Sequence, residues 1–201
     1  RVTATPEKWE GHGGAEIGEE LILAKDLFKE VIRHHCEEIE TFPGSDLIGR
    51  SYEPLFPGAV DRNGSETAWT VIGADWVTTT DGTGVVHTAV MYGEDDYNLG
   101  MEVGLPAQHT VGMDGSFLEG THSDLDGKYV KDCDETIIGL LHDSNLLYRE
   151  KMYLHDYPHC WRTGHPLLYY AMDSWFVKMT AVKDKLLEFN SQVEWAPDWV
   201  G

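Results

Sequence analysis

The segment GTGVVHTAVMYGEDDY, residues 82–97, contains the pattern on which the fold depends. Two glycines precede an apolar run typical of a buried strand, and the acidic triplet EDD then begins a run with helical character over 94–104. A strand, a turn and a helix start of this kind can place His87 and Asp96 on opposite walls of a pocket. The alternative interpretation is that the acidic residues only complement the helix dipole and that His87 is a hydrogen-bonded core residue.

Short strands and helices alternate on both sides of this segment without a regular period. Amphipathic spacing predicts helices over 26–35, from about Lys131 to Leu141, and over 180–193. In the first of these, Leu27, Val31 and His34 lie on one face. Residues 108–127 predict hairpins or a long loop. The fold class is therefore predicted to be mixed α and β (α+β). The β-rich runs that predict strands are 20–25, 37–42, 68–73, 75–80, 82–90, 146–157, 166–172 and 174–179.

The chain of 201 residues is long enough for one well-buried core, and we interpret it as a single domain, 1–201, with appended ends. Residues 1–17 have no clear period and predict a mobile or edge-strand segment. The amino terminus has no basic segment followed by an apolar one, which indicates an excised fragment rather than a signal peptide. No stretch approaches the roughly 18 consecutive apolar residues of a membrane helix, so we expect no membrane partner.

The formal net charge of −20 argues against independent nucleic-acid binding. Such an acidic surface repels phosphate and cannot supply affinity through counterion release. If the domain acts on tRNA, the phosphate contacts must come from a larger protein, and this part contacts only the end of the strand. The cysteines, Cys36, Cys133 and Cys160, are odd in number and far apart, which indicates free thiols and a cytoplasmic location.

The stretch HDYPHCWRTGH, residues 155–165, suggests a second kind of site. Its ligand types suit zinc, but neither a CxxC pair nor a second cluster completes a tetrahedral set. The favoured interpretation is a loop whose aromatic residues, Tyr157 and Trp161, pack on the core, and no metal is predicted. The zinc ligands considered are His155, His159, Cys160 and His165.

Four ordered segments resemble the editing domain of the isoleucyl-tRNA synthetases, which are class I aminoacyl-tRNA synthetases. GTGVVHTAVMYGEDDY resembles the core editing motif, and residues 157–179, YPHCWRTGHPLLYYAMDSWFVKM, resemble the downstream block. GSDLIGRSYEPLF, 44–56, and GKYVKDCDETIIGLL, 127–141, resemble linking segments. The editing domain of a valyl or leucyl enzyme is the alternative, but valyl enzymes differ at EDDY and HCWR, and leucyl enzymes differ further around Asp96. The resemblance extends from about Leu21 to the end, where 175–201 resembles the segment that leads back to the catalytic domain.

The resemblance implies the editing-domain fold of the valyl, isoleucyl and leucyl synthetases, a distorted β-barrel with flanking helices. It implies hydrolysis of the ester of mischarged Val-tRNA(Ile), with the 3′ end of that tRNA and the rest of the parent synthetase in cis as partners. For isoleucyl enzymes the synthetic site is known to discriminate about 150-fold, since one methylene is worth only about 1–3 kcal/mol. No cofactor is expected in this fragment, because ATP and Mg belong to the parent catalytic domain.

By the same resemblance, Asp96 matches the aspartate that binds the α-ammonium of the misattached amino acid. His87 matches the histidine that shapes the pocket, and the segment from Thr83 to Thr88 would supply its wall. The adjacent residues predicted to support the site are Tyr92, Gly93 and Asp95.

Two departures from the family pattern limit what the resemblance implies. The threonine-rich segment of the type WTTTPWTLPSN is not found in this chain, and the run Thr78–Thr80 is a different element. The isolated chain is therefore expected to have an incomplete pocket and little activity, or to be a non-catalytic module that only binds the aminoacyl-tRNA 3′ end. Thr163 stands where zinc-binding relatives read a second cysteine, in HCWRC, so the ligand set is broken.

Overall fold

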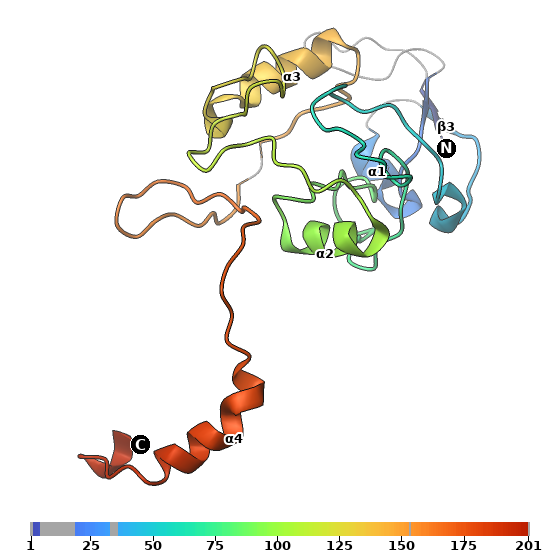
Figure 1. Ribbon diagram of the computed structural model, residues 1–201. Coiled ribbons are helices and arrows are strands. Elements are labelled where there is room, and N and C mark those ends of the chain that lie inside the picture. Colours follow the sequence, from blue (N-terminus) through green and yellow to red (C-terminus); the bar gives the residue numbers. More distant parts are fainter. Residues whose placement is uncertain (1, 5–18, 33–35, 153, 201) are drawn as a thin grey trace. The chain divides into compact units, whose positions relative to one another are not determined.

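The computed structural model describes residues 2–4, 19–32, 36–152 and 154–200. The chain divides into two compact units, Arg1–Ala171 and Met172–Gly201, which are described separately. Both contain helices, and strands occur in the first, so the fold class is mixed α and β as predicted (Figure 1). No helix among the described residues is long and apolar enough to cross a membrane.

A small antiparallel sheet begins the first unit. Its strands are β1 (Val2–Ala4), β2 (Glu20–Leu21) and β3 (Cys36–Glu38), in the order β2-β1-β3. Val2 lies opposite Leu21 on one side and opposite Glu38 on the other. The prediction of an edge strand near the amino terminus is therefore wrong for Val2–Ala4, because both neighbours pair with it. The rest of the predicted start, 5–17, lies outside the described residues.

A hydrophobic cluster lies on the chain between β2 and β3. The 3₁₀ turn η1 (Lys25–Leu27) continues into the short helix α1 (Phe28–Val31). Leu27, Val31 and Ile32 are buried there, so the apolar spacing predicted this face correctly. His34, the other residue assigned to it, lies outside the described residues. Residues packed against the cluster include Leu21, Leu23, Phe28, Cys36 and Tyr148.

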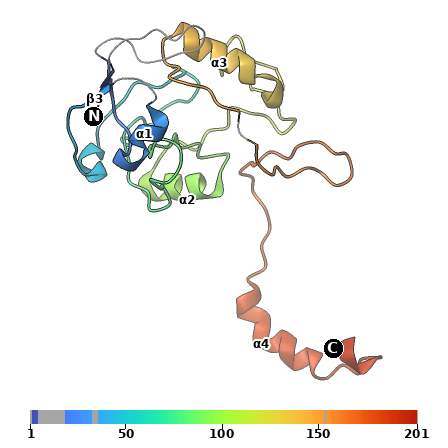
Figure 2. The ribbon, with the colours of Figure 1, turned by 180° about the vertical axis from the view of Figure 1, so that it is seen from behind.

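The predicted helix over 94–104 is confirmed as α2 (Glu94–Val103). Three acidic residues occupy its first turn, where the helix dipole favours negative charge. Gly104 ends it in the left-handed conformation, with φ of 76°, and the Leu105 N–H donates to the Gly100 carbonyl at 2.8 Å. The hydroxyls of Ser65 and Thr67 donate to carbonyls at this end, so the preceding loop runs beside α2, as Figure 2 shows.

The predicted helix near Lys131 is also confirmed. The 3₁₀ turn η3 (Val130–Asp132) leads into α3 (Asp134–Asp143), and Cys133 between them is fully buried. The loop before it, over 108–127, contains the expected hairpin contacts, because Val111 pairs with Phe117.

Most of the other predicted strands form no ladder in the described residues. Only isolated bridges occur, such as Ser51 with Thr70 and His159 with Pro166, and another 3₁₀ turn, η2, spans Gly44–Leu47. In 82–90 the N–H groups of Val85 and Ala89 bond to the side chains of Thr83 and Asp96, and the Thr83 carbonyl accepts the Ala24 N–H outside any ladder. The described residues accordingly show no closed barrel.

The second unit contains α4 (Met179–Asn190) and the 3₁₀ turn η4 (Asp198–Val200). The predicted helix over 180–193 is confirmed within a few residues. The predicted strand at 174–179 is not, because this part of the chain is extended without a pairing partner among the described residues. Its apolar side chains are uncovered within the described chain: Trp175 is fully exposed and Phe176 is 90% exposed.

Candidate functional site

A tight turn and the first residues of α2 hold Asp96. The Tyr92 N–H donates to the Ala89 carbonyl at 2.9 Å, which closes the turn, and Gly93 follows as the N-cap of the helix. Asp96 is the third residue of α2, and its Oδ1 accepts the Ala89 N–H at 3.0 Å. One carboxylate oxygen is thus anchored to the turn, and the side chain is only half-buried. Asp96 is in this respect an N-terminal helix acid, as the alternative interpretation held.

Gly93 leaves room for the Asp96 carboxylate. A methyl group on its Cα would overlap the Asp96 Oδ2 atom. Its φ of −150° is extended backbone that any residue adopts, so the backbone alone does not select glycine. The missing side chain lets the carboxylate fold back against the N-cap.

A second close contact fixes α2 against the turn. Gly100 is buried, and a methyl group there would come within 2.8 Å of a Val90 methyl. Helix and turn are therefore held together at two glycines, one at the N-cap and one two turns along the helix. This arrangement fixes where Asp96 lies relative to the segment before it.

The extended segment before the turn carries the other predicted residues. His87 is exposed, so the alternative that it is a core residue is wrong. The Thr83 hydroxyl donates to the Val85 carbonyl at 3.0 Å, and the Thr83 carbonyl accepts the Ala24 N–H at 2.8 Å. Thr88 is half-buried.

His87 and Asp96 are joined by no hydrogen bond or ion pair within the described residues. The pocket predicted between them stays a prediction. Asp95 is exposed beside Asp96 on the first turn of α2, and Glu94 is exposed as well. The helix start therefore presents three carboxylates, of which Asp96 is the one bonded to the turn.

The sequence did not indicate how strongly Tyr92 is held. Its phenol oxygen accepts the N–H groups of Thr110 at 2.7 Å and of Val111 at 2.8 Å. Its ring packs edge-on against His109 and Tyr170, which stack on each other with centroids 4.1 Å apart. These partners are distant in sequence, and no local spacing signals such contacts.

The histidine-rich loop gathers no metal ligands: no group of three His, Cys, Asp or Glu residues at metal-binding range is found in the described part of the chain. The His159 ring lies 2.8 Å from the Tyr157 carbonyl oxygen. Lys131 Nζ lies 4.2 Å from the centre of the Tyr157 ring. Trp161 is 86% exposed, so the prediction that it packs on the core is wrong.

Cys160 in this loop has an unusual environment. All three cysteines are free. Hydrogen bonds from the Thr163 hydroxyl, the Thr163 N–H and the Arg162 N–H lower the pKa of the Cys160 thiol. Burial raises the pKa of the Cys36 thiol instead. Thr163, at the position of the missing second cysteine, thus stabilises the thiolate of the first.

We expect iodoacetamide to alkylate Cys160 faster than Cys36 at neutral pH, with a half-maximal rate at lower pH. The reason is that the thiolate is the reactive form, and a lowered pKa increases its fraction. Mass spectrometry of labelled peptides measures both rates, and fully buried Cys133 serves as the protected control. Thr163→Val should slow Cys160 alone. A pH midpoint for Cys160 at or above that of Cys36 would contradict the assignment.

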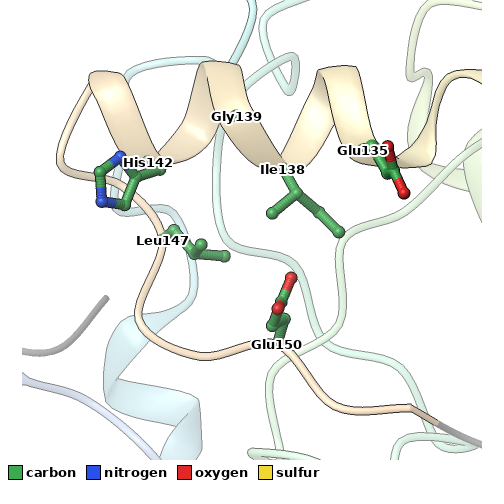
Figure 3. A pocket seen from close by; sticks show the side chains of 6 residues that line it. All are labelled: Glu135, Ile138, Gly139, His142, Leu147 and Glu150. Carbon is green, nitrogen blue, oxygen red and sulfur yellow. The ribbon is translucent and has the colours of Figure 1, made fainter. Parts of the chain in front are cut away.

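A hollow of about 320 Å³ lies on α3, apart from these residues. One side of the helix lines it together with two residues that follow, and Figure 3 shows Ile138 and Leu147 facing the space from opposite sides. None of the candidate residues lines it. The lining residues are Glu135, Ile138, Gly139, His142, Leu147 and Glu150.

The chain is similar to proteins that share one name, isoleucine–tRNA ligase. No family model matches the chain. The isoleucine–tRNA ligase of Clostridium novyi (strain NT) is 44% identical over 181 residues, which is 90% of this chain and 17% of that protein. The isoleucine–tRNA ligases of Clostridium tetani and Bacillus thuringiensis (strain Al Hakam) are 45% and 43% identical, again over 90% of this chain and 17% of their own length.

Proposed function

We propose, starting from the homology of this chain to one segment of the isoleucine–tRNA ligases, that it is their editing domain and hydrolyses mischarged Val-tRNA(Ile). The observation that carries the proposal is the position of the Asp96 carboxylate at the start of α2. The Ala89 N–H bonds to one of its oxygens, and the absence of a side chain at Gly93 leaves room for the other. The complete domain would have the distorted barrel and flanking helices of this family.

Asp96 would bind the α-ammonium of the misattached valine. One of its oxygens is held by the turn, and the carboxylate keeps further lone pairs for the substrate. A charge-assisted hydrogen bond of this kind is short and strong and fixes the direction of the amino acid. The ester carbonyl is then held where a water molecule can attack it.

His87 and the segment around it would form the side-chain pocket. The exposed residue His87 and the half-buried Thr88 directly precede the turn that holds Asp96. A pocket wall at this position can accept valine and exclude the larger isoleucine. A single methylene provides too little binding energy for one site to separate valine from isoleucine. A second site that excludes isoleucine by size adds the missing discrimination.

The proposed reaction is the hydrolysis of an ester and needs few catalytic groups from the protein. Water adds to the ester carbonyl, the bond to the tRNA hydroxyl breaks, and the products are valine and uncharged tRNA. An aminoacyl ester is already activated, so orientation and hydrogen bonds to the developing oxyanion account for the rate enhancement. The proposal therefore includes no metal and no covalent nucleophile.

The parent synthetase in cis would supply what this chain lacks. The net charge of −20 disfavours contacts to the tRNA backbone, so those contacts would come from the rest of the protein. The uncovered Trp175 and Phe176 are suited to contact that protein as well, because exposed aromatic side chains are commonly buried at interfaces. ATP and Mg would act in its catalytic domain, in the cytoplasm.

The test is hydrolysis of Val-tRNA(Ile) and Ile-tRNA(Ile), measured side by side. We expect the full-length protein to release valine at least about tenfold faster than isoleucine, since one methylene allows a ratio of that order. Equal rates for the two substrates would overturn the proposal. The 201-residue chain assayed alone shows whether this segment hydrolyses the ester or only binds the 3′ end, and insensitivity to a chelator would exclude metal-dependent hydrolysis.

A further inference from the structure

We infer that Tyr92 is a positioning residue for Asp96. The inference rests on the proposed function and concerns the same site. Tyr92 contacts no predicted substrate group. It acts through the turn that joins it to Asp96.

The phenol of Tyr92 ties this turn to a distant segment. Its oxygen accepts the N–H groups of Thr110 and Val111 at 2.7 and 2.8 Å, and it lies 3.3 Å from the Thr110 hydroxyl. Two successive backbone donors on one oxygen fix both the ring and the segment that carries them. A tyrosine in this place is therefore a crosslink rather than a simple packing residue.

Aromatic packing adds a third segment to the crosslink. Tyr92 meets His109 and Tyr170 edge-on, with ring centroids 5.9 and 6.1 Å away. The Nδ1 atom of His109 is buried without a hydrogen-bond partner in the part of the chain that the structure describes, so its ring contacts hold it. The Tyr170 hydroxyl donates to the Val111 carbonyl at 3.1 Å. The segments around 91, 110 and 170 thus meet at Tyr92.

The link to Asp96 passes through one residue. The Tyr92 N–H donates to the carbonyl of Ala89, and the N–H of Ala89 donates to Asp96 Oδ1. Tyr92 and Asp96 are therefore both bonded to Ala89, Tyr92 at its carbonyl and Asp96 at its N–H. If the Tyr92 ring is released, Ala89 gains freedom and the carboxylate loses its fixed partner.

Hydrogen exchange on the 201-residue chain tests this link without reference to activity. Tyr92→Phe keeps the ring and removes only the phenol oxygen. We expect the amides of Thr110 and Val111 to exchange about five- to tenfold faster, which is the effect of losing one ordinary hydrogen bond. The amide of Ala89 should also exchange several-fold faster. An unchanged Ala89 amide beside faster Thr110 and Val111 amides would overturn the inference.

Kinetics of the full-length protein supply the second readout. For Tyr92→Phe we expect kcat for Val-tRNA(Ile) hydrolysis to fall about five- to tenfold, with KM within about twofold and an unfolding temperature lower by about 2–4 °C, because two backbone N–H groups lose their acceptor. Tyr169→Phe is the matched control, because that ring is 65% exposed and belongs to no contact described above. If Tyr92→Phe fails to fold, Tyr170→Phe replaces it, and an unchanged Ala89 amide and kcat would then overturn the inference.

The outcomes separate this inference from the proposed function. An active Tyr92→Phe with normal kcat beside an inactive Asp96→Ala overturns the positioning role and leaves the editing function standing. A fully active Asp96→Ala overturns the editing function. In that case a faster Ala89 amide in Tyr92→Phe still shows that Tyr92 orders the turn.

Discussion

Replacing Asp96 by alanine is expected to lower hydrolysis of Val-tRNA(Ile) by about 100- to 1000-fold in the full-length protein. Removing one partner of a desolvated charge pair typically costs about 2–5 kcal/mol, and each 1.4 kcal/mol is a factor of ten in rate. Activation of isoleucine should be unchanged, because it takes place in another part of the parent protein. Deacylation of purified Val-tRNA(Ile) and isoleucine-dependent pyrophosphate exchange measure the two activities.

The matched control for this variant is Glu94→Ala. Glu94 is an exposed acid in the same first turn of α2. Both variants lose about 0.3–1 kcal/mol of interaction with the helix dipole, but only Asp96→Ala also loses the bond from Ala89. Deacylation should therefore survive in Glu94→Ala. Normal deacylation in Asp96→Ala, or equal loss in both variants, would show that Asp96 has no role in binding the substrate.

Gly93→Ala is expected to be nearly as harmful, although it adds only one methyl group. The methyl would overlap Asp96 Oδ2, so the carboxylate must rotate away from the N-cap. A misplacement of about 1 Å can cost about 100-fold in rate, and we expect a loss of about 10- to 100-fold in Val-tRNA(Ile) hydrolysis. Stability should fall by only about 0.5–1.5 kcal/mol, the net contribution of the hydrogen bond from the Ala89 N–H that the displaced carboxylate loses, measured as the free energy of unfolding in urea.

Gly139→Ala provides the comparison at a glycine with open space. Gly139 lies within α3, and no atom stands within 4 Å of a methyl group placed on it. Alanine is favoured over glycine inside a helix by about 0.5–1 kcal/mol, so this variant should be slightly more stable. If Gly93→Ala kept the full rate, the Asp96 carboxylate would not need the place that the structure gives it.

The helices were predictable because their signals are local. α2 begins with acidic residues and ends at Gly104, and both features lie within or beside the helix itself. α3 and α4 follow from apolar residues at three- and four-residue steps. The buried face of α1 was predicted in the same way, through Leu27 and Val31.

The strands were less predictable because an extended run becomes a strand only when another segment pairs with it. The apolar run around His87 has the composition of a strand, yet the N–H of Ala89 bonds to Asp96 and that of Val85 to Thr83. β1 shows the opposite case: Val2–Ala4 has no strong signal, but two strands pair with it. Pairing is decided by residues far away in sequence.

In the candidate site, too, the features with local signals were predictable and those that depend on distant residues were not. The sequence placed Asp96 at a helix start, which is where the structure has it. It could not reveal that Thr110, Val111 and Tyr170 meet at Tyr92, because those contacts depend on the folded chain. The steric role of Gly93 was equally hidden, since an extended glycine resembles any other loop residue until the neighbouring carboxylate is located.

The Ala171 N–H donates to the carbonyl of Met91 at 2.9 Å, at the point where the first unit ends. Met91 is in the turn that holds Asp96. Beside it, Tyr170 donates to the Val111 carbonyl and packs against Tyr92, so the end of the first unit is attached to the turn by several contacts. The turn that holds Asp96 is therefore bonded to the last residue of the first unit, so the two are expected to order or loosen together.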